Sequence, residues 1–281
     1  MIILNKLFKH KISRNITMNL KSLFKRLFCG VCIITTLCAC SRSNWKLVWQ
    51  DDFNGSGIDY TVWSHTDRGN ADWANTQSKD PRCYEMRGGC LVLKGIVNDD
   101  LEADTAHYLT GGIWTKGKHA FDCGRIEVRA RLQGAKGAWP AIWLLPFDTE
   151  NNHWPNGGEI DIMEEVGCVP NEVSCTIHCT KYNNGGTSIE HWKKNIGNAE
   201  STFHTYGVEW TKDYITFYLD GAPTLTYTND GSGKNQWPFD VPFYPILNLA
   251  WGGAWGGMYG VDESALPCTM EIDYLRIFQK K

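Results

Sequence analysis

The sequence has no excess of charge of one sign, since 28 Lys and Arg against 31 Asp and Glu give a formal net charge of −3. This balance argues against nucleic acid or an anionic membrane surface as the main partner, because both attract strongly basic proteins. The sequence also lacks a long, well-capped helical period, an internal repeat and any change of composition after residue 44. A chain of 281 residues with these features predicts one substantial domain that is built without long helices.

A complete set of paired cysteines is also missing. Seven cysteines lie after the N-terminal leader, and an odd number cannot form a complete disulfide framework. No pair has the spacing of a zinc site. The segment from Cys175 to Cys179 looks metal-binding, but in a strand these two thiols share one face while His178 points to the other. We therefore expect free, mostly buried thiols at positions 83, 90, 123, 168, 175, 179 and 268.

The N-terminal leader has no apolar run long enough to span a bilayer. Basic residues precede an apolar stretch at 27–37, which is too short for a stable spanning helix. The stretch ends in Leu-Cys-Ala-Cys at 37–40, which resembles a bacterial lipobox with Cys40 as the lipidated first residue of the mature chain. We expect a lipoprotein signal peptide at 1–40, one domain at 41–281, and an exported protein with a lipid anchor in the cell envelope, on the outer membrane or cell surface. An ordinary cleaved signal, with Cys40 incidental, is the alternative.

Short strand-like segments separated by Gly, Asn, Asp and Pro turns fill the rest of the chain. Asp220-Gly221 is a hairpin signal directly after one of them. Regular strand spacing without helices predicts an all-β sandwich of two antiparallel sheets. Examples of the expected strands lie at 125–132, 142–145, 160–163, 174–179, 205–209, 214–219, 244–250 and 270–278.

The most informative segment is WPNGGEIDIMEE at 154–165. In a strand, Glu159 and Asp161 project to one face, and a β-bulge with Met163 as the extra residue would return Glu164 to that face. Three acids this close repel one another when all are ionised, so at least one pKa should be raised. A solvent-facing acidic edge strand is the alternative, although such edges usually carry Lys or mixed charges.

This arrangement has the parts of a glycosidase centre. A retaining glycosidase needs a carboxylate nucleophile and a carboxylic acid about 5–5.5 Å apart. A bulge lets the tips of Glu159 and Glu164 converge to that distance, and Asp161 between them can share a proton with the nucleophile. The pattern therefore indicates retaining glycoside hydrolysis.

The segment also resembles the signature of glycoside hydrolase family 16, in the bulged form typical of laminarinase-like endo-β-1,3-glucanases. The resemblance covers essentially all of residues 45–281. It implies a concanavalin A-like jelly roll with the glycan cleft on one sheet. Further blocks similar to the family, in order, lie at 49–55, 115–118, 124–130, 137–143, 176–178, 203–210, 252–257 and 270–276.

The resemblance assigns Glu159 as nucleophile, Glu164 as general acid/base and Asp161 as supporting carboxylate. Glu165 matches no catalytic position and should face away from Glu164. His178 is expected to hydrogen-bond within the acid face and so orient the acid/base, with a purely structural histidine as the alternative.

Thirteen tryptophans, all after residue 44, offer flat apolar faces that suit sugar rings as well as a core. Core roles remain the alternative for Trp139 and Trp143. The segments 75–81 and 108–114 depart from the family pattern, which puts the subsite preference in doubt. The expected substrate-binding residues are Trp139, Trp143, Trp154, Trp251, Trp255 and His178.

Catalysis of this kind requires no cofactor, but members of the family often carry a structural calcium ion. The matching positions are Asp52, Asp273 and the carbonyl of Gly89, whose oxygen ligands would suit Ca²⁺. Two solvated aspartates are the alternative.

The sequence thus predicts a monomeric, endo-acting, retaining β-glucanase whose partner is a β-1,3 or mixed β-1,3/1,4-glucan. Three alternatives remain open: a hydrolase for agar, porphyran or carrageenan, a transglycosylase, and a non-catalytic surface glycan-binding lipoprotein. The retention of all three carboxylates counts against the last, and the absence of a basic excess gives no support to sulfated galactans.

Overall fold

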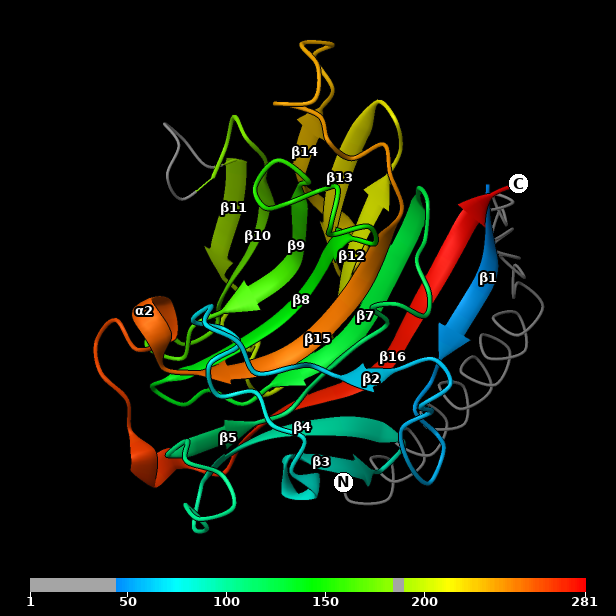
Figure 1. Ribbon diagram of the computed structural model, residues 1–281. Coiled ribbons are helices and arrows are strands. Elements are labelled where there is room, and N and C mark those ends of the chain that lie inside the picture. Colours follow the sequence, from blue (N-terminus) through cyan, green and yellow to red (C-terminus); the bar gives the residue numbers. More distant parts are fainter. Residues whose placement is uncertain (1–43, 184–189) are drawn as a thin grey trace, which may run out of the picture. The chain divides into compact units, whose positions relative to one another are not determined.

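Two antiparallel β-sheets packed face to face make up the part of the chain that the computed structural model describes, residues 44–183 and 190–281 (Figure 1). The predicted all-β sandwich of two antiparallel sheets is therefore confirmed. Cys40 and the rest of the expected signal peptide lie outside the described residues. Among the residues described, no helix has the length and apolar character needed to cross a membrane.

The first sheet has nine strands in the order β14-β13-β12-β7-β16-β4-β3, with β1 paired to β16 and β5 paired to β4. Its strands are β1 (Trp45–Asp51), β3 (Tyr84–Arg87), β4 (Cys90–Val97), β5 (Tyr108–Thr110), β7 (Gly124–Leu132), β12 (His204–Trp210), β13 (Tyr214–Leu219), β14 (Ala222–Thr228) and β16 (Cys268–Lys280).

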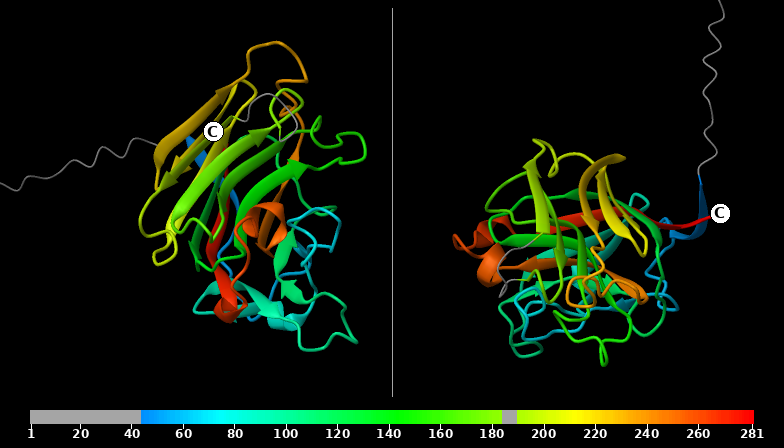
Figure 2. Two further views of the ribbon diagram at one scale, coloured as in Figure 1. Left: turned by 90° about the vertical axis from the view of Figure 1, so that its left-hand side faces the viewer. Right: turned by 90° about the horizontal axis from the view of Figure 1, so that it is seen from above.

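The second sheet has seven strands in the order β11-β10-β9-β8-β15-β6-β2. Its strands are β2 (Ser64–His65), β6 (Gly112–Trp114), β8 (Ala138–Pro146), β9 (Glu159–Glu165), β10 (Glu172–His178), β11 (Glu190–Asn195) and β15 (Phe243–Trp251). A short helix, α2 (Gly253–Gly256), follows β15, and two 3₁₀ turns lie at Pro81–Cys83 and Glu263–Ala265. The two sheets form stacked layers when the molecule is turned (Figure 2).

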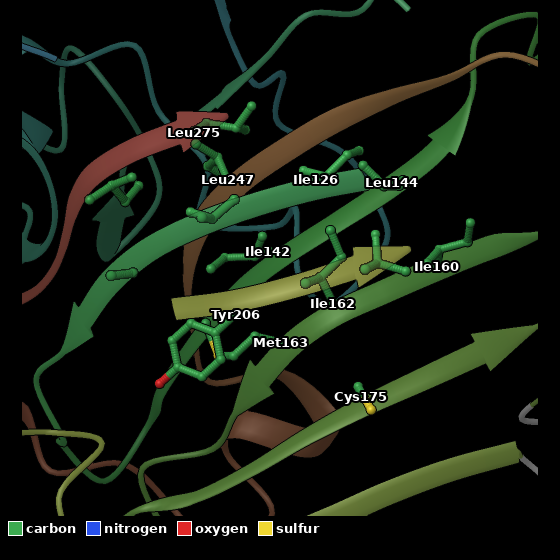
Figure 3. Close-up of a cluster of buried hydrophobic side chains, with 14 of the residues drawn as sticks. Ile126, Ile142, Leu144, Ile160, Ile162, Met163, Cys175, Tyr206, Leu247 and Leu275 are labelled. Atoms are coloured by element: carbon green, nitrogen blue, oxygen red, sulfur yellow. The ribbon is translucent and has the colours of Figure 1, made fainter. Parts of the chain in front are cut away.

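The main core lies between the sheets and follows from alternation along the strands. Every second residue of β7 is buried, as the period of a strand with one covered face requires. Figure 3 shows the apolar side chains of both sheets meeting, among them Ile126 and Leu275 from the first sheet and Ile142, Leu144 and Ile160 from the second. Full burial of such a side chain contributes about 1.5–3 kcal/mol, so these contacts hold the layers together.

All eight predicted strands are present, and Tyr214–Leu219 has the predicted bounds. Strand β8 was expected only at 142–145 but runs from Ala138 to Pro146, and β15 is longer by one residue at each end. All nine residues of β15 are buried. A strand that is covered on both faces shows no polar alternation, which hides its ends in the sequence.

The cysteines follow the expectation. All seven in the described residues are free thiols, and five are buried. Cys175 and Cys179 belong to the main core, whereas His178 on the same strand faces the other way.

Candidate active site

A glycine turn directs the chain into β9 at the centre of the second sheet. Gly158 has a φ of +84°, and a Cβ atom there would lie 2.7 Å from the ring of Phe239. Glycine is therefore the residue that fits both the backbone and the space at this point. The turn ends at Glu159, which begins β9 between β8 and β10.

The predicted β-bulge in β9 is confirmed by its pairing with β8. Ile142 lies opposite Met163, and the next residue, Trp143, lies opposite Asp161, so that Ile162 has no partner on β8. We expected Met163 to be the extra residue, and this was wrong, because the residue without a partner on β8 is Ile162. Ile162 and Met163 both enter the main core, at 3% and 0% exposure, and the space between the sheets accommodates both side chains.

The bulge brings Glu164 to the outer face of the sheet, which already carries Glu159 and Asp161. On β10, His178 lies opposite Glu159 and Ser174 lies opposite Glu164, and directly opposed residues share a face. We call the outer side of the second sheet the carboxylate face. Asp161 is only 2% exposed, so its charge is largely withdrawn from water.

Burial governs the protonation of the three acids. Burial raises the pKa of Glu164 to about 7, although the hydrogen bond from Trp139 opposes the increase. The pKa of Glu159 lies well above its ordinary value because of burial and the neighbouring charge of Asp161. The pKa of Asp161 is raised by burial and by Glu164. Carboxylate oxygens of Glu159 and Asp161 lie within 4.8 Å of each other, so the two acids influence each other's ionisation, and a proton that moves to Asp161 leaves Glu159 ionised.

A tryptophan lies beside each of the two glutamates. The indole N–H of Trp139 donates to Glu164 Oε1 at 3.0 Å, and Trp255 of α2 packs edge-on against Trp139 with ring centroids 5.3 Å apart. Trp154, which is 49% exposed, lies beside Glu159 and opposes the rise in the pKa of this acid. The structure thus places Trp139, Trp154 and Trp255 at the carboxylates, where sequence reasoning expected substrate contacts.

His178 lies close to Glu159 and Asp161. Its Nε2 is 3.1 Å from Asp161 Oδ2, and its ring lies 6.2 Å from that of Trp154. Three side-chain atoms that could ligate a metal, a carboxylate oxygen each from Glu159 and Asp161 and a ring nitrogen of His178, lie within 4.8 Å of one another. The charge of His178, when protonated, favours the ionised form of Glu159.

Trp143 shares the carboxylate face but is 5% exposed, and its N–H donates to Asn248 Oδ1 at 2.7 Å. The residue that encloses it is Trp73, whose ring is 4.9 Å away and edge-on. Sequence reasoning missed Trp73. It lies in a loop at 66–79 whose sequence has no helical or strand period. This loop is fixed to β15, which is distant in the sequence, because the Gln77 side-chain N–H donates to the carbonyl of Leu249 at 2.9 Å.

The expectation for Trp251 was wrong. This side chain is 1% exposed and belongs to the main core. A Cβ atom on Gly137 would lie 3.0 Å from its ring, so the indole fills the space that this glycine leaves. Such an enclosed ring has no surface to offer a glycan.

Of the three calcium positions, Asp273 lies on β16, Asp52 directly follows β1, and Gly89 lies in the turn between β3 and β4. Arg276 donates to Asp52 Oδ1 at 2.9 Å, and Arg129 forms an ion pair with Asp273. Gly89 packs beside Asn54, with a Cβ atom placed 3.0 Å from the amide oxygen. A guanidinium competes with Ca²⁺ for each carboxylate, so these residues as arranged do not fit the ion.

Comparison with known proteins agrees with the geometry. The family model described as glycosyl hydrolases family 16 matches residues 90–276. A β-glucanase of Rhodothermus marinus is 35% identical over 285 residues, covering 94% of this chain and 98% of its own. The chain belongs to glycosyl hydrolases family 16.

Two further proteins are similar to this chain over most of its length. A point mutant of SCLam, a non-specific endo-β-1,3(4)-glucanase from family GH16 co-crystallised with 1,3-β-D-cellotriosyl-glucose, superposes with a TM-score of 0.78 at 35% identity, covering 85% of this chain and 96% of that one. A keratan-sulfate endo-1,4-β-galactosidase of Sphingobacterium multivorum is 37% identical over 247 residues, or 85% of this chain, and this chain spans 56% of that protein. Family 16 hydrolases retain the anomeric configuration.

Proposed function

We propose that the protein is an endo-acting, retaining β-glucanase that hydrolyses β-1,3 linkages in laminarin-type and mixed β-1,3/1,4-glucans. The observation that carries this proposal is the bulge, which places Glu159, Asp161 and Glu164 on one face. The glucanases among the relatives support the choice of substrate.

Two displacements at the anomeric carbon follow from this arrangement. Protonated Glu164 gives its proton to the leaving glycosidic oxygen while Glu159 attacks the anomeric carbon, which breaks the glycosidic bond and forms a glycosyl ester. Glu164, now ionised, takes a proton from water, and the hydroxide attacks the ester and releases Glu159. Asp161 accepts the proton that Glu159 must lose before it can attack.

A reducing-end assay on laminarin, barley β-glucan and agarose tests the proposal. We expect cleavage of both glucans and not of agarose. Glu159→Gln is the matched inactive control, because the amide has the shape of the acid but cannot form the ester. Cleavage of neither glucan by the wild-type protein, or retention of more than a few per cent of activity by Glu159→Gln, would reject it. When a gluco-oligosaccharide is the substrate, products longer than that oligosaccharide would indicate transglycosylation.

A galactan hydrolase is the second candidate, and one observation favours it. The keratan-sulfate endo-1,4-β-galactosidase is 37% identical to this chain. Keratan sulfate therefore joins the substrate panel. Cleavage of keratan sulfate without cleavage of either glucan would replace the first proposal with this one.

We also propose an exported, monomeric protein attached to the cell envelope by a lipid on Cys40. The lipobox-like sequence at 37–40 supports this placement. The catalytic chemistry is carried by carboxyl groups alone, so we propose that no cofactor is needed. A structural calcium ion would have to displace Arg276 and Arg129 from their aspartates.

A further inference from the structure

A pocket of about 430 Å³ opens at the edge of the second sheet, where β2 and β6 end the row of strands. None of the catalytic carboxylates lines it. Its walls combine the rings of Tyr60, His65 and Trp114 with two lysines, an aspartate and a serine, namely Lys79, Lys116, Asp67 and Ser64.

The pocket carries a net positive charge. Lys79 and Asp67 form an ion pair at 2.8 Å and neutralise each other. Burial and the charge of Lys79 lower the pKa of His65, so this ring is neutral at pH 7. The ammonium of Lys116 lies 4.8 Å above the ring of Trp114, and no ion pair of Lys116 occurs within the described residues. One uncompensated cation therefore sits beside an aromatic surface.

The register of the strands places this pocket in line with the catalytic residues. Ser64 lies opposite Trp114, Trp114 opposite Ile246, Ile246 opposite Trp143, and Trp143 opposite Asp161, so these residues form one row across the sheet. From β6 to β9 are three strand steps, or roughly 14 Å at the usual spacing.

One loop borders both places. Trp73 in this loop contacts Trp143 near the carboxylates, whereas Asp67 and Lys79 at its ends line the pocket. The loop is held close to the sheet at Gly112, where a Cβ atom would lie 2.3 Å from Gln77 Oε1. A glycan that crosses the strands from the cleavage point would thus meet the pocket several sugars away.

We propose that this pocket is a distal subsite for a sugar residue that carries an anionic substituent, a sulfate ester or a carboxylate. Tyr60, which is 56% exposed, presents apolar ring surface to the sugar, while the largely buried ring of Trp114 holds the Lys116 ammonium that pairs with the anion. The inference rests on the proposed function in assuming that the glycan lies across the carboxylate face. It adds that the preferred chain is not uniformly neutral.

Lightly substituted laminarin tests the subsite through the position of the charged sugar. One preparation carries sulfate esters at low density, a second carries carboxylates at C6, and the parent laminarin is neutral. Products are sequenced by mass spectrometry to find how far each charged sugar lies from the new chain end. We expect charged sugars at a fixed distance of several residues, enriched by about threefold to fivefold over random placement, as an exposed ion pair would give.

Variants of the pocket assign the effect. Lys116→Gln should remove the enrichment, and Lys116→Arg should keep it. Asp67→Asn frees Lys79 and should increase it. Lys46→Gln is the control, because Lys46 is exposed on β1 of the other sheet. The enrichment should weaken in high salt, which screens exposed charges. A random distribution in the wild-type protein, or an unchanged enrichment in Lys116→Gln, would overturn the subsite. Enrichment with one of the two anions only would identify which substituent is bound.

Binding separates this inference from the proposed function. The affinity of Glu159→Gln for sulfated, carboxylated and neutral gluco-oligosaccharides is measured by calorimetry, with and without Lys116→Gln. A preference for the charged ligands of about threefold that Lys116→Gln abolishes supports the subsite even if no glucan is cleaved. Equal affinity for charged and neutral ligands rejects the subsite even if laminarin is hydrolysed.

Discussion

At the scale of single residues, each of the two glutamates on the carboxylate face has a tryptophan beside it. Trp139 donates to Glu164 Oε1 at 3.0 Å, and Trp154 lies beside Glu159. Each N–H stabilises the ionised form of its glutamate and so opposes the rise in pKa that burial causes. The tryptophans therefore tune the acids in addition to offering surface to a sugar.

The pH profile should report the tuning of Glu164. As the general acid, Glu164 must be protonated in the free enzyme, and its pKa is raised to about 7. We expect kcat/KM to fall as the pH rises through about 7. Trp139→Phe removes a hydrogen bond that lowers this pKa, so the alkaline limb should move to higher pH. Trp255→Phe is the control, because Trp255 packs on Trp139 without bonding to Glu164. An alkaline limb that stays in place in Trp139→Phe would contradict the assignment.

Removal of the acid/base should give a diagnostic product. In Glu164→Ala, cleavage of unactivated glucans should fall by about 10²–10⁴-fold, while an activated aryl glycoside should still react with Glu159. Azide should restore turnover and yield a β-glycosyl azide, because the second displacement no longer needs a general base. The anomer is assigned by NMR. An α-azide, or equal loss on both substrates without rescue, would exclude Glu164 from this role.

At the scale of elements, the bulge in β9 sets the position of Glu164. Deletion of Met163 would restore simple alternation, with Glu164 two positions after Asp161. The carboxylate would keep its face but shift by a fraction of the 3.3 Å residue repeat. Catalysis tolerates a misplacement of about 1 Å poorly, so we expect about 10²-fold lower kcat. Circular dichroism and thermal unfolding serve as controls for folding. Wild-type activity in the folded deletion variant would show that the bulge is not needed.

The inner side of the same strand carries a further acid, Glu165, which lies near Glu200 from the loop before β12. Glu165 is 2% exposed and accepts a hydrogen bond from the backbone N–H of Asn171 at 2.8 Å. Burial and the neighbouring charge of Glu200 raise the pKa of Glu165 to about 8. Its side chain faces away from Glu164, as expected. Its role is therefore structural rather than catalytic.

Glu165 should make the protein less stable at alkaline pH. Its pKa is higher in the folded state than in the unfolded state, so folding binds a proton between about pH 4.5 and about 8. The free energy of unfolding should fall as the pH rises through this window. Glu165→Gln keeps the acceptor for Asn171 without the charge, and it should raise stability at pH 8 by a few kcal/mol with little effect at pH 5. Chemical denaturation at both pH values checks this, and equal effects at the two would refute it.

At the scale of the whole molecule, the chain combines a family 16 domain with a lipobox-like leader. We expect the mature protein to partition with membranes, and Cys40→Ser to release it or to block its processing. Membrane fractionation and intact mass give the readout. An unmodified mature N-terminus at another residue would show that the leader is an ordinary cleaved signal.

Eight of the sixteen strands in the described residues and the carboxylate face could be predicted from the sequence because both depend on neighbours along the chain. Alternation in a strand places Glu159 with Asp161, and one extra residue returns Glu164 to them. The eight expected strands were found for the same reason, although only Tyr214–Leu219 has the predicted ends.

Only the tertiary structure decided what lies against these local patterns. Trp251 is a core residue and Trp73 covers Trp143 because of how distant segments pack, and no period in the sequence encodes that. The same holds for the pocket at Lys116, which forms where β2, β6 and the ends of a loop meet. Local sequence sets the direction of a side chain within its strand, whereas its burial, its pKa and its partners depend on contacts between residues far apart in the chain.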